Sequence, residues 1–203
     1  MWSSEVTNMI IAGIGETLYM TLVSTIAGYI IGLPMGIVLT VSDKDGIRPN
    51  SFIYKILDVI VNIVRSIPFI ILLVLLIPFT RFLVGKSYGS TATIVPLVVA
   101  AAPYIARMVE SSLKEVDAGV IEAARSMGAS DFDIVTKVLL VEARTSLLVG
   151  ATISLGTILG YSAMSGAVGG GGLGAIAIRY GYTRWQTDIM IVTVVLLVVL
   201  FQI

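Results

Sequence analysis

Long runs of apolar residues, separated by short polar segments, dominate the chain. The first run covers residues 17–41, which is 25 residues without a charge. At about 1.5 Å per residue, a helix of this length crosses a hydrocarbon core of about 30 Å. Further runs follow at residues 59–80, 88–106, 145–167 and 189–203. The pattern predicts an all-α integral membrane protein with five transmembrane helices per subunit.

The two ends of the chain differ from this pattern. Residues 1–15 are only weakly apolar, which predicts a short helix lying at the membrane interface. The last run has fifteen residues, too few to span, so we expect its helix to continue past Ile203. The N-terminus has no basic segment and its first apolar run is long, which argues against a cleaved secretory signal.

Glycines and prolines indicate where helices pack closely or bend. Gly28, Gly32 and Gly36 form two overlapping GxxxG steps, and Gly156 and Gly160 form another. Such steps let helix backbones approach each other. Five prolines lie in or beside the apolar runs, at Pro34, Pro68, Pro78, Pro96 and Pro103. Kinks of this kind favour a translocation pathway over an inert anchor.

The distribution of Lys and Arg predicts the orientation in the membrane. Alternate loops carry eight basic residues on one side, or nine with Arg65, against four on the other. Cytoplasmic loops are the ones enriched in Lys and Arg. We therefore expect the N-terminus outside and, with five spans, the C-terminus in the cytoplasm.

The composition excludes several classes of protein. The chain is 57% hydrophobic and only 13% charged. Its formal net charge is zero, so it has no overall positive field that would attract nucleic acid. Cys and His are absent. Disulfides, Cys/His zinc sites and His-dependent catalytic triads are therefore excluded, which leaves only an Asp/Glu metal or acid–base site open.

Two glycine motifs lack the context that nucleotide binding requires. Residues 85–87 resemble the end of a P-loop, but Thr80 stands where that motif needs its first glycine. Residues 169–174 fit GxGxxG, yet no strand–helix unit can be drawn around them. We interpret residues 166–174, which include six glycines, as a flexible hairpin that makes a tight return.

One long polar segment, residues 107–144, holds seven of the 13 acidic and five of the 13 basic residues. Gly128, followed by Ser130 and Asp131, predicts that one helix stops and another begins at once. The segment is thus interpreted as helix, sharp turn, helix on the cytoplasmic surface. Its apolar face favours a docking surface for a partner over the alternative, a solvated loop on the membrane.

Part of this segment resembles the EAA motif of ABC importer permeases. That motif reads E-A-A, three residues, G, nine residues, I-x-L-P. The residues that match it are Glu122, Ala123, Ala124, Gly128 and Leu140. Val138 and Val141 replace the isoleucine and the proline of the motif.

Residues 65–69, 102–107 and 161–174 are similar to the methionine-uptake members of that family. The likeness extends over nearly the whole chain. It implies a bacterial inner-membrane transport subunit, not an enzyme, with one permease domain at residues 1–203 and a coupling segment at about 108–144. The expected partners are a second copy of the chain, membrane lipid, two ABC ATPase subunits that bind ATP and Mg, and an external methionine-binding lipoprotein.

The resemblance also implies two sets of functional residues. The helix that couples to the ATPase would contain Ile121, Glu122, Ala123, Ala124, Arg125, Met127, Gly128 and Ala129. The candidates for the substrate path are Ser66, Pro68, Tyr161, Met164 and Ser165. Met164 suits an apolar, flexible substrate because its thioether is polarizable.

Several alternatives remain open at this point. Within the ABC family, the substrate would be a quaternary ammonium compound or another amino acid. Outside it, the chain would be a channel or a secondary transporter, although the predicted spans contain no ionisable relay of the kind that ion coupling needs. An intramembrane enzyme is the third class, and the absence of His and Cys argues against it.

Overall fold

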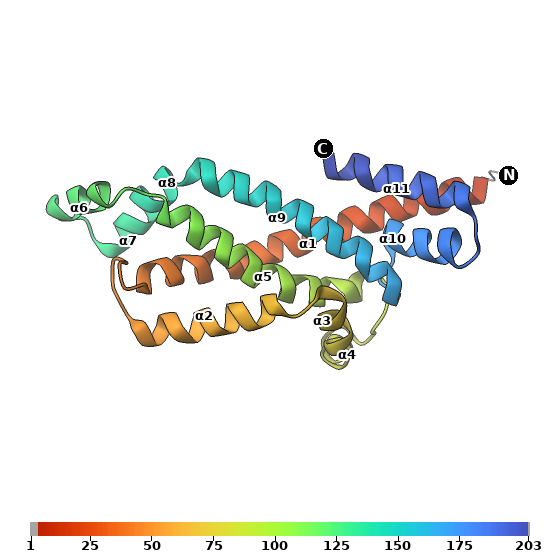
Figure 1. The fold of residues 1–203 in the computed structure, drawn as a ribbon, viewed down its shortest axis with the longest axis horizontal. Coiled ribbons are helices and arrows are strands. Elements are labelled where there is room, and N and C mark those ends of the chain that lie inside the picture. Colours follow the sequence, from red (N-terminus) through yellow and green to blue (C-terminus); the bar gives the residue numbers. More distant parts are fainter. Residues whose placement is uncertain (1–3, 203) are drawn as a thin grey trace. The chain divides into compact units, whose positions relative to one another are not determined.

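The structure is a computed structural model that describes residues 4–202, and within this range it is helical without strands. The predicted all-α class is therefore confirmed. Short η1 and η3 are π-helical and η2 is a 3-10 turn. In chain order the elements (Figure 1) are α1 (Ser4–Ser42), α2 (Ser51–Ser66), α3 (Phe69–Leu75), α4 (Ile77–Val84), α5 (Ser90–Lys114), α6 (Ala118–Ser126), α7 (Asp131–Asp133), η1 (Ile134–Leu139), α8 (Leu140–Glu142), α9 (Arg144–Ser165), η2 (Gly166–Val168), α10 (Gly172–Ile176), η3 (Ala177–Tyr182) and α11 (Thr187–Gln202).

Internal contacts divide the chain into two compact units. Unit 1 takes in residues up to Ile26, residues 67–100 and residues from Leu155 onward, and unit 2 consists of Ala27–Ser66 and Ala101–Ser154. Helices α1, α5 and α9 each contribute residues to both units. A single permease domain over the whole chain stays a prediction.

Among the described residues, three helical stretches are long and apolar enough to cross a membrane: Ser4–Ser42, Ser90–Lys114 and Arg144–Tyr182. The span predicted at residues 59–80 is not a single helix, because the chain breaks between α2 and α3, and these two helices would count as one span only as a bent pair. Pro68 causes this break, since proline has no N–H and disfavours a helical conformation in the residue before it. Helix α11 is shorter, so the five-span count is still a prediction.

The separate interfacial helix expected at residues 1–15 is also wrong for its described part. Helix α1 is continuous over 39 residues and carries Pro34 inside it. The hydroxyl of Thr17 donates to the carbonyl of Gly13 at 2.8 Å, across the point where the two elements were expected to separate. Weak apolarity in the first turns was therefore not a sign of a helix boundary. Residues 1–3 lie outside the described residues.

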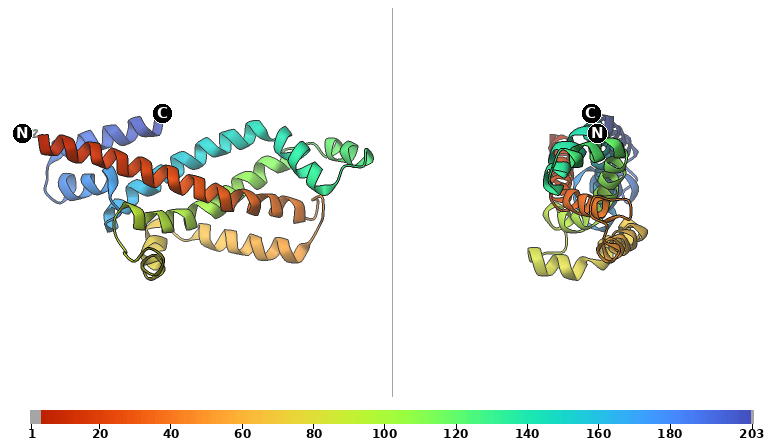
Figure 2. Two further views of the ribbon diagram at one scale, coloured as in Figure 1. Left: turned by 180° about the vertical axis from the view of Figure 1, so that it is seen from behind. Right: turned by 90° about the vertical axis from the view of Figure 1, so that its left-hand side faces the viewer.

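The core of unit 1 lies where α10 and α11 pack beside the first turns of α1. Ile10, Leu173, Ile176 and Ile189 are buried together there. Figures 1 and 2 show the three helices side by side from opposite directions. The apolar residues of a short helix are thus covered by two long ones, which fixes the chain after the glycine segment.

The core of unit 2 depends on close packing between α1 and α5. A Cβ atom added to Gly32 would lie 2.6 Å from the carbonyl oxygen of Ala102, and one added to Gly36 would lie 2.6 Å from that of Ala106. A Cβ atom on Gly28 would lie 2.9 Å from the side chain of the neighbouring helix. The prediction that these GxxxG steps allow close helix packing is therefore confirmed.

The second GxxxG step behaves differently. A Cβ atom on Gly156 would lie 3.0 Å from the ring of Phe201, so this glycine does face a neighbouring helix in unit 1. Gly160 has nothing within 4 Å of the same added atom. In the described part of this chain, only the first glycine of the step makes room for a neighbour.

Candidate functional site

The polar segment after α5 folds as helix, turn, helix, as predicted. Helix α6 ends at a turn in which Gly128 has φ +84°, a conformation that glycine adopts without strain. The N–H of Gly128 donates to the carbonyl of Arg125 at 2.9 Å, and that of Ala129 donates to the carbonyl of Ala124 at 3.1 Å. These two bonds define a Schellman motif, which satisfies the last carbonyls of the helix.

The next helix begins immediately, also as predicted. The hydroxyl of Ser130 accepts a hydrogen bond from the backbone N–H of Asp133 at 3.2 Å and donates to its carboxylate at 2.5 Å. Lys137 binds the same carboxylate at 2.6 Å. The hydrogen bond from Lys137, and then that from Ser130, lowers the pKa of Asp133 below its ordinary value. Reciprocal capping of this type fixes the start of α7.

Helix α6 has an inner face and an outer face, and the predicted coupling residues are divided between them. Ile121 is half-buried and Ala124 is 6% exposed, while the guanidinium of Arg125 donates to the carbonyl of Ile47. The exposed positions of the helix are Glu122, Ala123, Arg125, Ser126 and Met127, and Met127 is 83% exposed. Glu122 and Arg125 also line a pocket behind the helix. Gly128 is exposed and Ala129 half-buried at the turn. The side chain of Met127 is therefore accessible to a partner.

A pocket of about 420 Å³ lies behind the inner face of α6, within unit 2. Its walls come from α6, from the end of α5 and from the loop between α1 and α2, residues 43–50. Both acidic and basic side chains line it, among them Asp43, Lys114 and Arg125. The predicted coupling helix is therefore attached to the rest of unit 2 through a polar junction.

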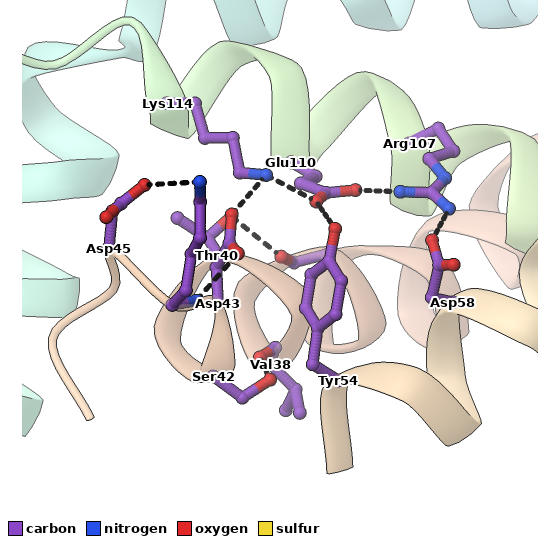
Figure 3. A network of polar contacts seen from close by, with 12 residues as sticks. Val38, Thr40, Ser42, Asp43, Asp45, Tyr54, Asp58, Arg107, Glu110 and Lys114 are labelled. Atoms are coloured by element: carbon purple, nitrogen blue, oxygen red, sulfur yellow. Dashed lines mark hydrogen bonds and ion pairs between the residues drawn. The ribbon is translucent and has the colours of Figure 1, made fainter. Parts of the chain in front are cut away.

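A network of charged residues links α5 to its neighbours beside this junction (Figure 3). Glu110 is 4% exposed, and one of its oxygens, Oε2, accepts from Nη1 of Arg107 at 2.6 Å. The other, Oε1, accepts from Nζ of Lys114 at 2.8 Å and from the hydroxyl of Tyr54 at 3.4 Å. Three donors on one buried carboxylate compensate for its removal from water.

The same two bases reach acids on other elements. Arg107 forms an ion pair with Asp58 of α2, and Lys114 binds Asp43, just after α1, at 2.6 Å. The hydrogen bond from Lys114 is the largest cause that lowers the pKa of Asp43. The network therefore joins the ends of three helices within unit 2, and Figure 3 shows these side chains pointing toward one another.

The sequence interpretation missed this network. The third span was expected to end at residue 106, whereas α5 continues to Lys114 and takes in the buried Glu110. On α5 the network lies beyond residue 106, so the expectation that the predicted spans contain no ionisable relay stays a prediction. The spacing of Arg107, Glu110 and Lys114, three and four residues apart, places them on one helix face and was a usable signal.

The candidate path residues fall partly around one stacked ring pair in unit 1. Pro68 precedes the first turn of α3, and the ring of Phe69 stacks on Tyr161 with centroids 4.6 Å apart. Met164 is 50% exposed. Ser165 is fully buried, and its hydroxyl donates to the carbonyl of Ser162 at 2.6 Å.

The remaining path candidate, Ser66, lies in unit 2, at the end of α2. It is exposed, and its hydroxyl donates to the carbonyl of Asn62 at 2.8 Å. Both serines thus use their hydroxyl groups on nearby backbone. Among the five candidates, the other three are Pro68, Tyr161 and Met164, which lie in unit 1 near the stacked rings or on the half-exposed surface of α9.

The glycine segment makes the predicted tight return, but it is anchored instead of free. The carboxylate of Glu16 accepts the N–H of Gly172 at 2.6 Å, and the hydroxyl of Thr17 accepts the N–H of Leu173 at 2.9 Å. On α5, the hydroxyl of Thr93 donates to a backbone carbonyl of the segment at 3.3 Å. No local pattern in the sequence identified these three anchoring side chains.

Comparison with known proteins decides the family. Residues 28–203 match the family described as the binding-protein-dependent transport system inner membrane component. The chain belongs to this family. Its apolar helices and its polar segment are therefore those of an inner-membrane transport component.

Two named relatives illustrate the similarity to this inner-membrane transport family. The probable D-methionine transport system permease protein MetI of Vibrio cholerae is 46% identical over 202 residues, which is 100% of this chain and 90% of that protein. The D-methionine transport system permease protein MetI of Salmonella typhimurium is 55% identical over 158 residues, or 78% of this chain and 73% of that protein.

Solved structures give the same picture. A chain from inward-facing conformations of the MetNI methionine ABC transporter superposes with a TM-score of 0.97 and 52% sequence identity, covering 99% of this chain and 93% of that one. A chain of an amino acid ABC transporter with histidines has a TM-score of 0.79 at 22% identity. The second likeness concerns the fold alone.

Proposed function

We propose that this chain is the membrane-spanning permease subunit of an ATP-driven importer of methionine. The observation that carries the proposal is the 52% identity and TM-score of 0.97, over 99% of the chain, with a subunit of the MetNI methionine ABC transporter. The named relatives, which are D-methionine transport permeases, support the same substrate. In this proposal two copies of the chain form the path, with two ATPase subunits below and a substrate-binding lipoprotein outside.

The proposed topology has five spans, with the N-terminus outside the bacterial inner membrane and the C-terminus in the cytoplasm. The excess of Lys and Arg on alternate loops supports this orientation. The second span would be the bent pair α2–α3 and the fifth would contain α11. The polar segment with α6 then lies on the cytoplasmic side, where the partner ATPases bind ATP and Mg.

We assign the coupling role to residues 121–129. The exposed Met127 and the small Ala123 on the outer face of α6 support docking into a cleft of the ATPase, because they offer apolar contact and close approach. Glu122, which is exposed at the edge of the pocket, supplies a charge for a basic partner. Gly128 supports the assignment through its turn, which presents the end of α6 without bulk.

The residues proposed for the substrate path are Ser66, Pro68, Tyr161, Met164 and Ser165. The stacked pair at Tyr161 and the half-exposed Met164 support this assignment for an apolar substrate. Uptake of labelled D- and L-methionine, with a quaternary ammonium compound and other amino acids as competitors, tests the substrate. Competition by the ammonium compound alone would contradict the methionine assignment.

The coupling assignment is tested by a pair of matched variants. Gly128→Arg places a bulky cation at an open position with φ +84°, and Gly85→Arg does the same at an open position with φ +78° at the end of α4. Both variants carry the same backbone strain, so the second controls for folding. We expect Gly128→Arg to lose the ATPase in a detergent pull-down and Gly85→Arg to retain it. Retention of the ATPase and of uptake by Gly128→Arg would refute the assignment.

A further inference from the structure

The two charged residues of α6, Glu122 and Arg125, both line the pocket, and the exposed Arg125 also makes a hydrogen bond within unit 2. Residues 121, 124 and 125 lie on the same side of the helix, since they are three and four positions apart. On that side Ala124 is buried, and the guanidinium of Arg125 donates to the carbonyl of Ile47. The guanidinium of Arg125 is therefore directed toward the loop at residues 43–50, although the residue stays exposed to solvent.

The loop that receives this hydrogen bond is fastened to the end of α1. The N–H of Arg48 donates to the carbonyl of Val41 at 3.0 Å, and that of Asn50 donates to the carbonyl of Ser42 at 2.9 Å. A Cβ atom on Gly46 would lie 2.5 Å from the carbonyl oxygen of Val41, so the loop lies against the helix end. A displacement of this loop consequently displaces the last turn of α1.

The same loop also begins α2. The side-chain oxygen of Asn50 accepts from the N–H of Phe52 at 3.1 Å and from that of Ile53 at 3.2 Å, which caps the first turn of α2. Ile47 itself is 8% exposed, so the acceptor of the Arg125 bond sits in a packed position. One loop thus connects α1 and α2 to one side chain of α6.

We propose that Arg125 is a positioning residue that transmits movement of α6 to α1 and α2 through the loop at residues 43–50. This inference rests on the proposed function, and it gives a residue of the coupling helix a role distinct from docking. Movement of α6 imposed by the ATPases pulls on the carbonyl of Ile47. The ion pair between Lys114 and Asp43 binds the same loop to α5, so the loop moves as part of unit 2.

The decisive experiment separates docking from transmission. The complex of permease, ATPase and binding protein is reconstituted in liposomes, and methionine uptake and ATP hydrolysis are measured together for wild type, Arg125→Ala, Arg125→Lys and Lys137→Ala. Lys137 is an exposed cation in the same segment whose ion pair is with Asp133, in the helical turn before it, so it controls for loss of charge.

We expect Arg125→Ala to retain the ATPase but to transport about tenfold less methionine per ATP hydrolysed, because a hydrogen bond from a charged donor shifts an equilibrium by about that factor. Arg125→Lys should restore part of the ratio and Lys137→Ala should leave it unchanged. A normal ratio in Arg125→Ala, or loss of the ATPase as in Gly128→Arg, would overturn the inference. A wild-type complex that neither retains the ATPase nor imports methionine would instead refute the proposed function.

A second measurement tests the same connection by restoring it covalently. The chain contains no cysteine, so Ile47→Cys with Arg125→Cys supplies the only thiols of the permease, and both positions line the same pocket. A short thiol crosslinker then replaces the lost hydrogen bond by a covalent one. Transmission through this point predicts that crosslinking raises the transport ratio and that cleavage of the linker lowers it again. Equal ratios before and after crosslinking would contradict the role of Arg125.

Discussion

The close approach of α1 and α5 predicts how much a glycine-to-alanine change between them lowers the free energy of unfolding. In Gly32→Ala the new methyl carbon would lie 2.6 Å from the carbonyl oxygen of Ala102 and 2.8 Å from Cβ of Ile105, whereas ordinary contact begins near 3.4 Å. Two of the three nearest atoms belong to a branched side chain close to its own backbone, so neither helix yields without a shift. Overpacking of this kind costs about 1–3 kcal/mol.

The matched control is Gly160→Ala, in the interior of α9. It makes the same chemical change in a helix, but nothing lies within 4 Å of the added carbon. Alanine favours a helix over glycine by about 1 kcal/mol at either position. This gain is common to both variants and cancels between them, so the two should differ in free energy of unfolding by about 1–3 kcal/mol, with Gly32→Ala the less stable.

The assay is unfolding of the purified, isolated subunit by sodium dodecyl sulfate in mild detergent, followed by circular dichroism. The isolated subunit is needed because a second copy or an ATPase would add contacts of its own. We expect Gly160→Ala to be at least as stable as wild type and Gly32→Ala to unfold at a lower fraction of the denaturing detergent. Equal stabilisation of both variants would refute the argument that α1 and α5 are in backbone contact at Gly32.

Two further predictions concern the charged network. Glu110→Gln removes a buried charge that accepts three hydrogen bonds, so it should lower the free energy of unfolding of the isolated subunit by about 1–3 kcal/mol. The control Glu142→Gln changes an exposed residue and should leave the stability unchanged. Equal effects of the two variants in the same unfolding assay would contradict the network. Because Lys114 lowers the pKa of Asp43 in the folded state, Asp43 contributes stability above its unfolded pKa of about 3.9 and loses it as the pH falls through the lower folded value. The advantage of wild type over Asp43→Asn, measured by unfolding from pH 7 to pH 3, should therefore be constant above about pH 5 and shrink below about pH 4; a constant difference throughout would contradict the ion pair.

Much of the fold follows from local patterns in the sequence. The apolar runs predicted where α1, α5, α9 and α11 lie, because lipid-exposed helices are apolar along their whole length. The turn at Gly128 was also predictable, since a glycine followed by Ser-Asp satisfies the end of one helix and the start of the next with residues that are neighbours in sequence.

The sequence did not indicate the features that depend on distant partners. Composition alone treats residues 59–80 as one apolar run, and the local effect of Pro68 was needed to see the break. Glu110 finds its bases on its own helix but Tyr54 on α2, and Arg125 finds Ile47 some eighty residues earlier. Such pairs are set by tertiary packing, so the residues that hold α6 in place are the ones that a single sequence conceals.

The anchored glycine segment at residues 166–174 has a consequence for how the protein moves. Glycine loses more conformational entropy on ordering than any other residue, so bonds such as those from Glu16 and Thr17 to Gly172 and Leu173 must offset an unusually large entropic loss. Once they do, the backbone amides of the segment are shielded, and their hydrogen exchange should follow the opening of α1. The glycines here set the distance between backbones, and they hold the segment against the part of α1 that carries Glu16 and Thr17.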